Sequence, residues 1–439
     1  MVSPASALAP TAPAMRRGAC PALSAPMQTG DGLLVRLATS EGGLTPARLA
    51  ALCRLATRHG NGIVEVTARG SFQIRGLTLA SAPLLESDVA ALDLPLREGV
   101  PVETSPLAGL DPREIANPLP LARAIREAIA AAGLSAGLGP KVSVVVDGGG
   151  AIDLSDLLAD VRLTAMRRDG AIAWNLAVGG TVATAKPVGV VAEEDAAAAV
   201  VAILEAIAAR GRDARGRDLA LPPPPASAVP LPRFAWEDRR PRASAAPDLP
   251  AFTGEGDHAK RGEGGGIALT DSRIALAAAL PFGSIEADDL AAFARQAEGL
   301  GVADIRLAPA RSLLLLCPDE AAISAVSNAA RDAGLILDAD DPRRSIAACP
   351  GSPACMSGRI TTREIARRLA EAGGLDGSVH VSGCAKGCAH PTPASLVLVG
   401  TDAGVALVRD GRASDTPEVI FPDPEAALAA LAIHPEPAE

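Results

Sequence analysis

The chain has 439 residues, of which 48% are hydrophobic and only 2% aromatic, and its formal net charge is −10. This length allows roughly two to four domains, and the hydrophobic content excludes a wholly disordered chain. The negative charge argues against nucleic acid or an anionic membrane surface as the main partner. No apolar run is long enough to cross a bilayer, and residues 1–15 lack the pattern of a secretory signal, so we expect a flexible tail there and a cytoplasmic protein.

The first half of the chain begins with a β-α-β pattern. Residues 30–37 are an apolar strand candidate, residues 45–58 have the period of an amphipathic helix, and a second strand begins at 62–66. We expect this strand to continue through residues 67–76. Arg69 and Arg75 would then point to the same side, because side chains alternate along a strand.

The same order of elements recurs after a Pro-rich and Gly-rich segment at 216–266, which we interpret as a linker. A strand is expected at 273–280, a helix at 286–299, and a further strand segment at 304–317 that contains Arg311, the counterpart of Arg69. These similarities indicate an internal duplication, whose two halves would enclose a central cleft. Chance similarity between short segments of an alanine-rich chain is the alternative.

The later parts of the two halves also correspond. Residues 169–176 resemble residues 402–409, and each segment is followed by an Ala/Leu-rich helix, at 194–208 and at 424–432. Both halves therefore predict a second α/β unit after the first.

Four of the seven cysteines lie in two short motifs, Cys349-x5-Cys355 and Cys384-x3-Cys388. Four thiolates are the usual ligand set of a [4Fe–4S] cluster, and the glycines around them allow backbone N–H groups to approach the sulfur atoms. A structural zinc site, disulfides and unpaired core cysteines are the alternatives. The remaining cysteines are scattered, and we interpret Cys53 and Cys317 as core residues and leave Cys20 unassigned.

The segment between the two cysteine motifs predicts a helix at 361–372 that sets the separation of the two loops. Thr361 and Glu364 match a capping box, and Gly373 follows the expected end of the helix.

The two cysteine motifs and the duplication resemble the sirohaem-containing sulfite and nitrite reductases. That resemblance covers roughly residues 16–435 and implies a duplicated α+β and α/β architecture, with two ferredoxin-like half-domains and two larger α/β domains. The expected parts are a ferredoxin-like repeat at 16–85, an α/β domain at 100–215, a second repeat at 267–338, and a cluster-bearing α/β domain at 339–436.

Three segments resemble one branch of this group, the precorrin-3B synthases of aerobic cobalamin biosynthesis. They are residues 16–32, Lys141-Val-Ser-Val-Val-Val-Asp-Gly-Gly-Gly150 and Ser382-Gly-Cys-Ala-Lys-Gly-Cys-Ala-His-Pro391. The resemblance implies a monooxygenase that uses O2 to hydroxylate precorrin-3A and close a γ-lactone. It also implies a [4Fe–4S] cluster and a mononuclear non-haem iron. A sirohaem-dependent sulfite or nitrite reductase is the alternative, although Ser143 stands where sulfite reductases carry the second lysine of a K-x-K strand.

A multiply carboxylated tetrapyrrole favours arginine forks and lysine as binding partners. The candidates for this role are Arg36, Arg69, Arg75, Lys141 and Arg311. For each arginine, a solvated surface position is the alternative.

His390 follows Cys388 by two residues and could bind the second iron or move a proton, or it could hydrogen-bond the cluster loop. His380 is a weaker candidate, and we expect His59 at the surface. Asp147-Gly-Gly-Gly150 favours a tight turn over a phosphate loop, and no dinucleotide fingerprint is present. We therefore expect electrons from an external donor, NAD(P)H directly or through a carrier.

Overall fold

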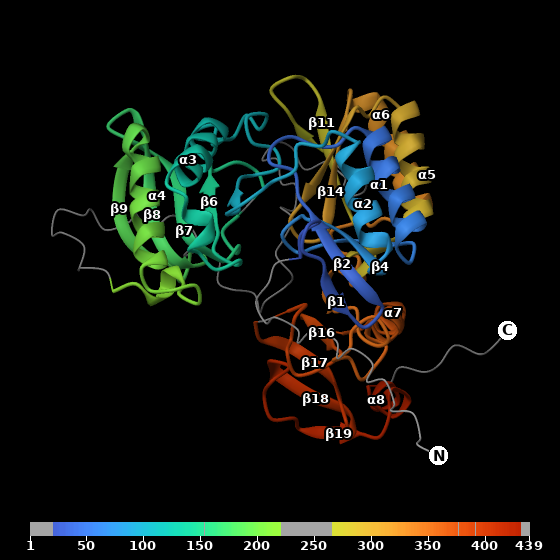
Figure 1. Ribbon diagram of the computed structural model, residues 1–439. Helices are drawn as coiled ribbons and strands as arrows, with labels where there is room; N and C mark the ends of the chain where they lie inside the picture. Colours follow the sequence, from blue (N-terminus) through green and yellow to red (C-terminus); the bar gives the residue numbers. More distant parts are fainter. Residues whose placement is uncertain (1–20, 153, 221–265, 376, 391, 432–439) are drawn as a thin grey trace, which may run out of the picture.

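A computed structural model describes residues 21–152, 154–220, 266–375, 377–390 and 392–431 (Figure 1). The expected tail at 1–15, Cys20, and most of the expected linker lie outside these ranges. Three bodies are visible, namely one α/β domain, a central pair of helix-covered sheets, and a second α/β domain.

The central body consists of two ferredoxin-like units. The first unit contains β1 (Met27–Thr29), β2 (Gly32–Leu37), α1 (Pro46–His59), β3 (Ile63–Val66), β4 (Phe72–Leu77) and α2 (Ser81–Ala90). The second unit contains β10 (Ile267–Ala268), β11 (Ile274–Ala279), β12 (Ser284–Glu286), α5 (Ala287–Gly299), β13 (Asp304–Ala308), β14 (Ser312–Cys317) and α6 (Glu320–Asp332). Their sheets have the orders β1-β2-β4-β3-β12 and β10-β11-β14-β13, so the core orders β2-β4-β3 and β11-β14-β13 are equivalent.

The two α/β domains share one topology. The first contains β5 (Val102–Glu103), α3 (Leu119–Ala131), β6 (Val144–Asp147), β7 (Ala159–Arg168), β8 (Ala171–Gly180), β9 (Lys186–Ala192) and α4 (Glu193–Ala208). The second contains β15 (Ile346–Ala348), α7 (Thr362–Ala372), β16 (Val379–Ser382), β17 (Ala394–Thr401), β18 (Gly404–Gly411), β19 (Val419–Phe421) and α8 (Pro424–Ala430). In each sheet the first three strands are parallel and the last two are antiparallel. This matched order confirms the expected duplication.

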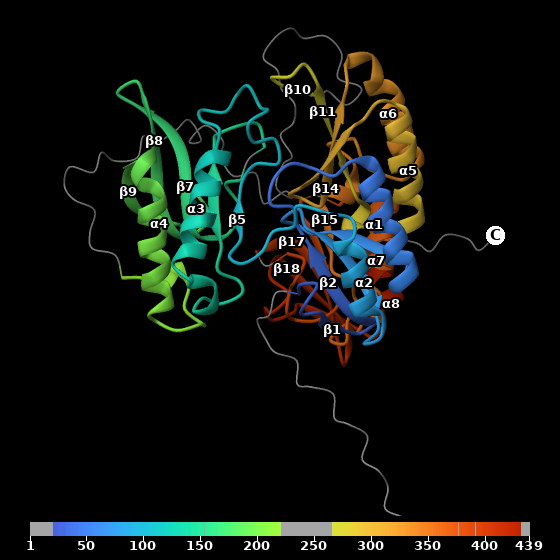
Figure 2. The same ribbon diagram turned by 45° about the horizontal axis from the view of Figure 1, so that its top comes forward.

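The two ferredoxin-like units exchange segments. Strand β12 of the second unit pairs with β3 of the first, and Leu44 of the first unit forms a bridge with Ile305 in β13 of the second. Helices α1 and α5 lie side by side, which Figures 1 and 2 both show. The apolar faces of both units therefore join in one core that contains Leu49, Ile74 and Leu315.

Strand β14 packs against the first α/β domain and so attaches that domain to the central body. Its residues are apolar without alternation because the strand is covered on both faces. Leu313 and Leu315 pack into the helical core, whereas Leu314 and Leu316 pack against Leu107 and other residues of the first α/β domain. The sheet of the second unit thus packs on the α/β domain of the other half.

Three sequence-based expectations were wrong. Residues 67–71 form a turn between β3 and β4, with Gly70 at a φ of +75°, so no continuous strand joins Arg69 to Arg75. Thr361 makes no capping hydrogen bond in α7, although Gly373 does end the helix at a φ of +64°. His59, the last residue of α1, is buried, and its Nε2 lies 2.7 Å from Oδ2 of Asp88 in α2.

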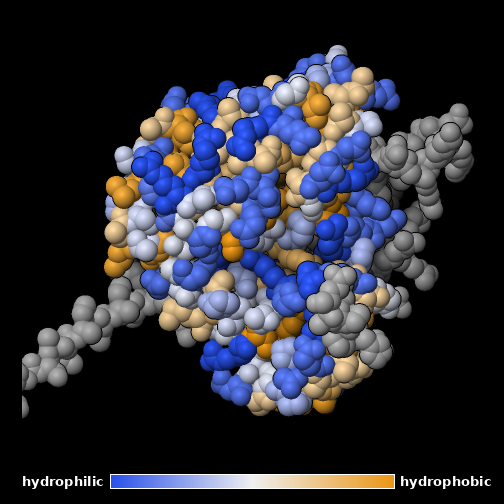
Figure 3. Space-filling view, turned by 90° about the vertical axis from the view of Figure 1, so that its right-hand side faces the viewer, coloured by the Kyte–Doolittle hydropathy of each residue, from blue (hydrophilic) through white to orange (hydrophobic). Residues whose placement is uncertain are grey.

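Within the described ranges, no helix is long and apolar enough to cross a membrane. On the side of the molecule shown in Figure 3, polar and apolar residues are interspersed. Cys53 and Cys317 are fully buried, as expected from their apolar neighbours.

Candidate redox centre and adjoining cleft

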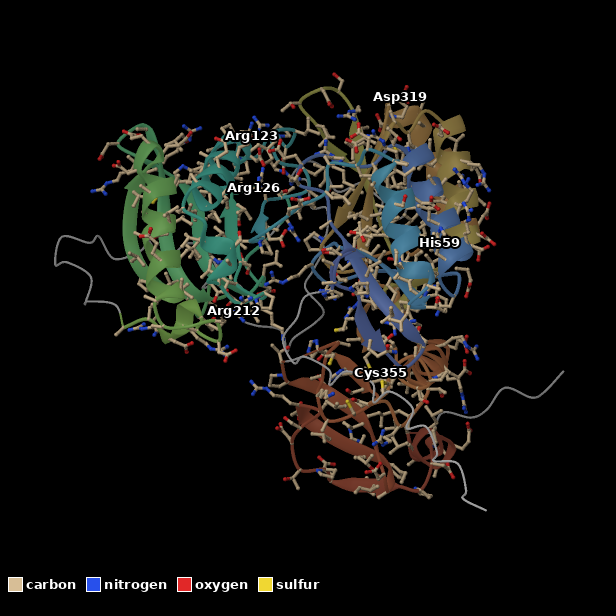
Figure 4. The ribbon with its side chains drawn as sticks, in the orientation of Figure 1. His59, Arg123, Arg126, Arg212, Asp319 and Cys355 are labelled. Carbon is tan, nitrogen blue, oxygen red and sulfur yellow. The ribbon has the colours of Figure 1, made fainter. Side chains whose placement is uncertain are left out.

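The two cysteine motifs meet at one edge of the second α/β sheet. Cys349 directly follows β15, and Cys384 and Cys388 follow β16. Because β15 and β16 are adjacent parallel strands, both loops leave the sheet at its carboxyl edge. Cys355 lies where this domain meets the first ferredoxin-like unit (Figure 4). The four thiols of these motifs are free, and their exposure increases from buried Cys349 to exposed Cys388.

Close backbone contacts build the cradle around these thiols. The backbone N–H of Gly383 donates to Cys349 Sγ at 3.2 Å, and the Thr362 hydroxyl donates to the Cys349 carbonyl. A Cβ on Gly383 would lie 3.1 Å from Gly358 Cα and 3.2 Å from Gly351 Cα. Larger residues would therefore push the loops apart.

The chemistry of the donor set suits an iron–sulfur cluster. Although residue Cys388 is exposed, partial burial of its thiol raises the pKa, and the nearby Cys384, Cys349 and Cys355 raise it further, so the four sulfur atoms form one electrostatic group. No three His, Cys, Asp or Glu side chains among the described residues converge tightly enough for a single metal ion. A cubane cluster is bound at separate iron corners and does not need such convergence.

His380 and His390 lie beside the second cysteine loop. Their ring centroids are 5.8 Å apart, and His390 Nε2 is 3.0 Å from Thr392 Oγ1. The His390 contact agrees with the alternative role of bonding the loop. Because no carboxylate joins the two histidines in the described part of the chain, these residues do not fit a facial-triad iron site.

A buried polar network ties the first ferredoxin-like sheet to the first cysteine loop. Arg75 of β4 donates to both carboxylate oxygens of Asp31, at 3.1 and 3.0 Å, and to the Ala354 carbonyl at 2.6 Å. Glu65 of β3 accepts from Arg75 at 3.5 Å and also from Arg363 of α7. Arg75 is 3% exposed, so its geometry indicates a structural role at the cluster loop instead of carboxylate binding.

The other candidate cations have different surroundings. Arg36 donates to Gln73 Oε1 from its Nε at 3.0 Å. Lys141 is exposed before β6, and its carbonyl accepts from Arg215. Arg69 donates to the Leu158 carbonyl in the first α/β domain.

Arg69 lies at the tip of the β3–β4 hairpin, and Arg311 lies at the equivalent tip of the β13–β14 hairpin in the second unit. Its Nη2 donates to the Ala389 carbonyl at 3.0 Å, directly after Cys388. Partial burial lowers the pKa of both Arg69 and Arg311, although the charge of Glu103 opposes the shift at Arg69 and that of Glu65 opposes it at Arg311. Within the described ranges, each guanidinium therefore has a backbone hydrogen-bond partner and makes no ion pair.

An open cleft with a cavity volume of about 70 Å³ adjoins Arg69 at the tip of the β3–β4 hairpin, between the first α/β domain and the ferredoxin-like units. Its polar lining includes Arg69, Arg97, Arg306, Glu41 and Glu103, and its apolar lining includes Leu154 and Leu157. Glu41 pairs with Arg123 and Arg126 and so links the ferredoxin-like unit to the first α/β domain. Figure 4 shows both arginines on α3.

Several of these residues were missed by the sequence analysis. Arg97 lies in a connection without a motif, and Arg306 is bound to Asp304 and to the Pro106 carbonyl of the other half. Glu65 lies between the apolar residues Val64 and Val66 in β3. A carboxylate inside an apolar strand was a sequence signal for the polar network of Arg75, Asp31 and Glu65.

Comparisons with known proteins agree with this geometry. A family model described as nitrite/sulfite reductase ferredoxin-like half domain matches residues 25–92. The chain is 41% identical to a precorrin-3B synthase from Sinorhizobium sp, over 93% of this chain and 86% of the relative. It is 25% identical to a ferredoxin–nitrite reductase from Synechococcus elongatus, over 85% of this chain and 77% of the relative. The structure of Mycobacterium tuberculosis NirA protein matches with a TM-score of 0.60 at 21% identity, covering 84% of this chain and 71% of that one.

Proposed function

The chain belongs to the precorrin-3B synthase family, and on that premise we propose that it inserts one oxygen atom of O2 into precorrin-3A and closes a γ-lactone. The second oxygen atom leaves as water, which requires two electrons and two protons. These electrons come from an external donor, either NAD(P)H directly or a carrier. The proposed location is the cytoplasm, where free thiols and a cluster persist.

The observation that carries this proposal is the contact between the two hairpin tips. The backbone N–H of Ala310 donates to the Ala68 carbonyl at 3.0 Å. The neighbouring Arg69 lines the cleft, and the neighbouring Arg311 contacts the loop of Cys388. A substrate in the cleft would therefore lie close to the cysteine loops, as electron delivery requires.

In this proposal Cys349, Cys355, Cys384 and Cys388 hold the [4Fe–4S] cluster, which supplies electrons one at a time when bound. The two hairpin-tip arginines bind carboxylates of the substrate, because each is half-buried and makes no ion pair among the described residues. Leu154 and Leu157 offer apolar surface to the macrocycle. The mononuclear iron implied by the family has no matching ligand set among the described residues, so no role is derived for it.

Anaerobically purified protein tests the proposal directly. Iron and acid-labile sulfide analysis should show one four-iron cluster, and incubation with precorrin-3A, reductant and O2 should give an oxygenated lactone. Arg69→Gln should weaken precorrin-3A binding while leaving the cluster spectrum unchanged. Cluster-loaded protein that fails to turn over precorrin-3A would refute the proposal.

The alternative function is a sirohaem-dependent reductase, which the more distant ferredoxin–nitrite reductase similarity favours weakly. It predicts tightly bound sirohaem in the purified protein. An absorption spectrum that contains cluster bands without sirohaem bands would rule in favour of the monooxygenase.

A further inference from the structure

We propose that His380 donates an N–H hydrogen bond to sulfur at the Cys388 corner of the cluster and thereby raises the reduction potential of that cluster. The inference rests on the proposed function, since it requires a bound cluster. His380 acts here as a positioning residue: it binds neither iron nor substrate.

The observation behind this inference is a buried imidazole without partners. His380 lies in the middle of β16 and is 0% exposed. Neither Nδ1 nor Nε2 has a hydrogen-bond partner among the described residues. A buried donor without an acceptor costs roughly 1–3 kcal/mol, and native structures rarely keep one unless a ligand or ion satisfies it.

The polar edge of the ring faces the second cysteine loop. A Cβ built on Gly387 would lie 3.6 Å from His380 Cε1, the ring carbon between the two nitrogens. Gly387 has a φ of +61° and directly precedes Cys388. That distance is ordinary van der Waals contact, so the imidazole edge packs against the loop one residue before Cys388.

The surroundings of His380 leave few other acceptors. The strands beside it contribute apolar side chains to this face of the sheet, including Val397 and Val399 of β17 and Val408 of β18. The nearest described ring belongs to His390, whose Nε2 already contacts Thr392 and Pro393. Thiolate and sulfide sulfur at the cluster are electron-rich acceptors, and hydrogen bonds to them raise the potential because they stabilise the additional electron.

The charge state of the imidazole supports a donor role. Burial lowers the pKa of His380 to about 4, and the charges of His390 and Arg311 lower it further. At neutral pH the ring is therefore uncharged, with one N–H to donate and one nitrogen as acceptor.

Redox titration of cluster-loaded variants, followed by EPR spectroscopy, tests the inference. His380→Leu removes the donor at similar volume, and His380→Gln restores an N–H. The neighbouring His390→Gln is the matched control, because its ring is engaged by the loop. We expect His380→Leu to change the ratio of oxidised to reduced cluster at a fixed potential about tenfold toward the oxidised form, a shift of 59 mV for a one-electron couple. His380→Gln should recover part of this shift, and His390→Gln should cause little.

Pulsed EPR of the reduced cluster in protein labelled with ¹⁵N-histidine gives a second reading. A ¹⁵N coupling that is present in wild type and in His390→Gln but absent in His380→Leu supports the hydrogen bond. An unchanged potential and coupling in cluster-loaded His380→Leu overturns it. If His380→Leu does not assemble a cluster, assembly in His380→Gln supports the donor role, and failure of both variants overturns it in favour of a packing role. Absence of iron and sulfide from wild type would instead refute the proposed function.

Discussion

Replacing Arg75 by methionine should destabilise the protein and release the first cysteine loop. The side chains of Arg75 and Glu65 are each 4% exposed, and that of Asp31 is 14% exposed. Breaking a buried ion pair by removing one partner costs about 3–5 kcal/mol. Glu65 keeps Arg363, and Asp31 keeps its bonds from Thr29 and Asn61, so the low end of that range applies.

The lost bond from Arg75 to the Ala354 carbonyl adds to this cost. A hydrogen bond from a charged donor contributes about 1.5–3 kcal/mol, so we expect Arg75→Met to lower the free energy of unfolding by about 4.5–6 kcal/mol in total. The loss should be localised, because Ala354 directly precedes Cys355. Amide hydrogen exchange over residues 349–360 should therefore accelerate.

The matched control is Arg58→Met. Arg58 pairs with Asp88 at 3.5 Å, but its side chain is 72% exposed, so its loss should cost at most about 0.5 kcal/mol. Urea unfolding followed by circular dichroism compares the two variants, and hydrogen exchange measures the loop. Equal destabilisation by both substitutions, or unchanged exchange at 349–360 in Arg75→Met, would refute the reasoning.

Three further predictions concern the cysteine loops and a half-buried carboxyl group of the first α/β domain. Gly30→Ala should displace the first cysteine loop and reduce iron content severalfold, because the new Cβ would lie 2.4 Å from the Pro353 carbonyl oxygen. The control is Gly299→Ala at the end of α5, whose Cβ would meet no atom within 4 Å and which should leave iron content unchanged. Burial raises the pKa of Glu114 to about 7, with Asp111 and Asp147 adding to the shift, so the unfolded chain releases this proton near pH 4.5 and the folded chain near pH 7. Stability from the protonated form is thus lost as the pH rises through 7. At about 1.4 kcal/mol per pKa unit, reduced for partial exposure, Glu114→Gln should stabilise the protein by about 2 kcal/mol at pH 8 and little at pH 4 in thermal melts. The same substitution at exposed Glu86 is the matched control. Cys388→Ser should lower the iron and sulfide content strongly, whereas Cys317→Ser in the buried core of β14 should lower stability without a specific loss of iron.

The fold was largely predictable because its signals are local. The apolar period of residues 45–58 predicted α1, and the recurrence of the same element order predicted the second ferredoxin-like unit. The failures were also local. The turn at Gly70 was missed because residues 62–76 carry apolar and β-branched residues on both sides of it, and Thr361 matched a capping pattern that the backbone does not use.

The candidate site was predictable only in part. Two cysteine pairs with glycine neighbours indicated a cluster from sequence, since ligand type and spacing are properties of the chain itself. The role of Arg75 was not predictable, because its partners Asp31, Glu65 and Ala354 come from three separate segments.

The sequence by itself determined most element types, the repeated order of elements and the pairing of four cysteines in two short motifs, because each of these depends on residues close together along the chain. Tertiary structure alone decided which half packs on which. The sheet of the first unit contacts the first cysteine loop of the second half through Arg75, while the sheet of the second unit packs on the first α/β domain through Leu314 and Leu316. Such crossed contacts join residues hundreds of positions apart, and their energies depend on burial and on the geometry of charged groups, which no local pattern encodes.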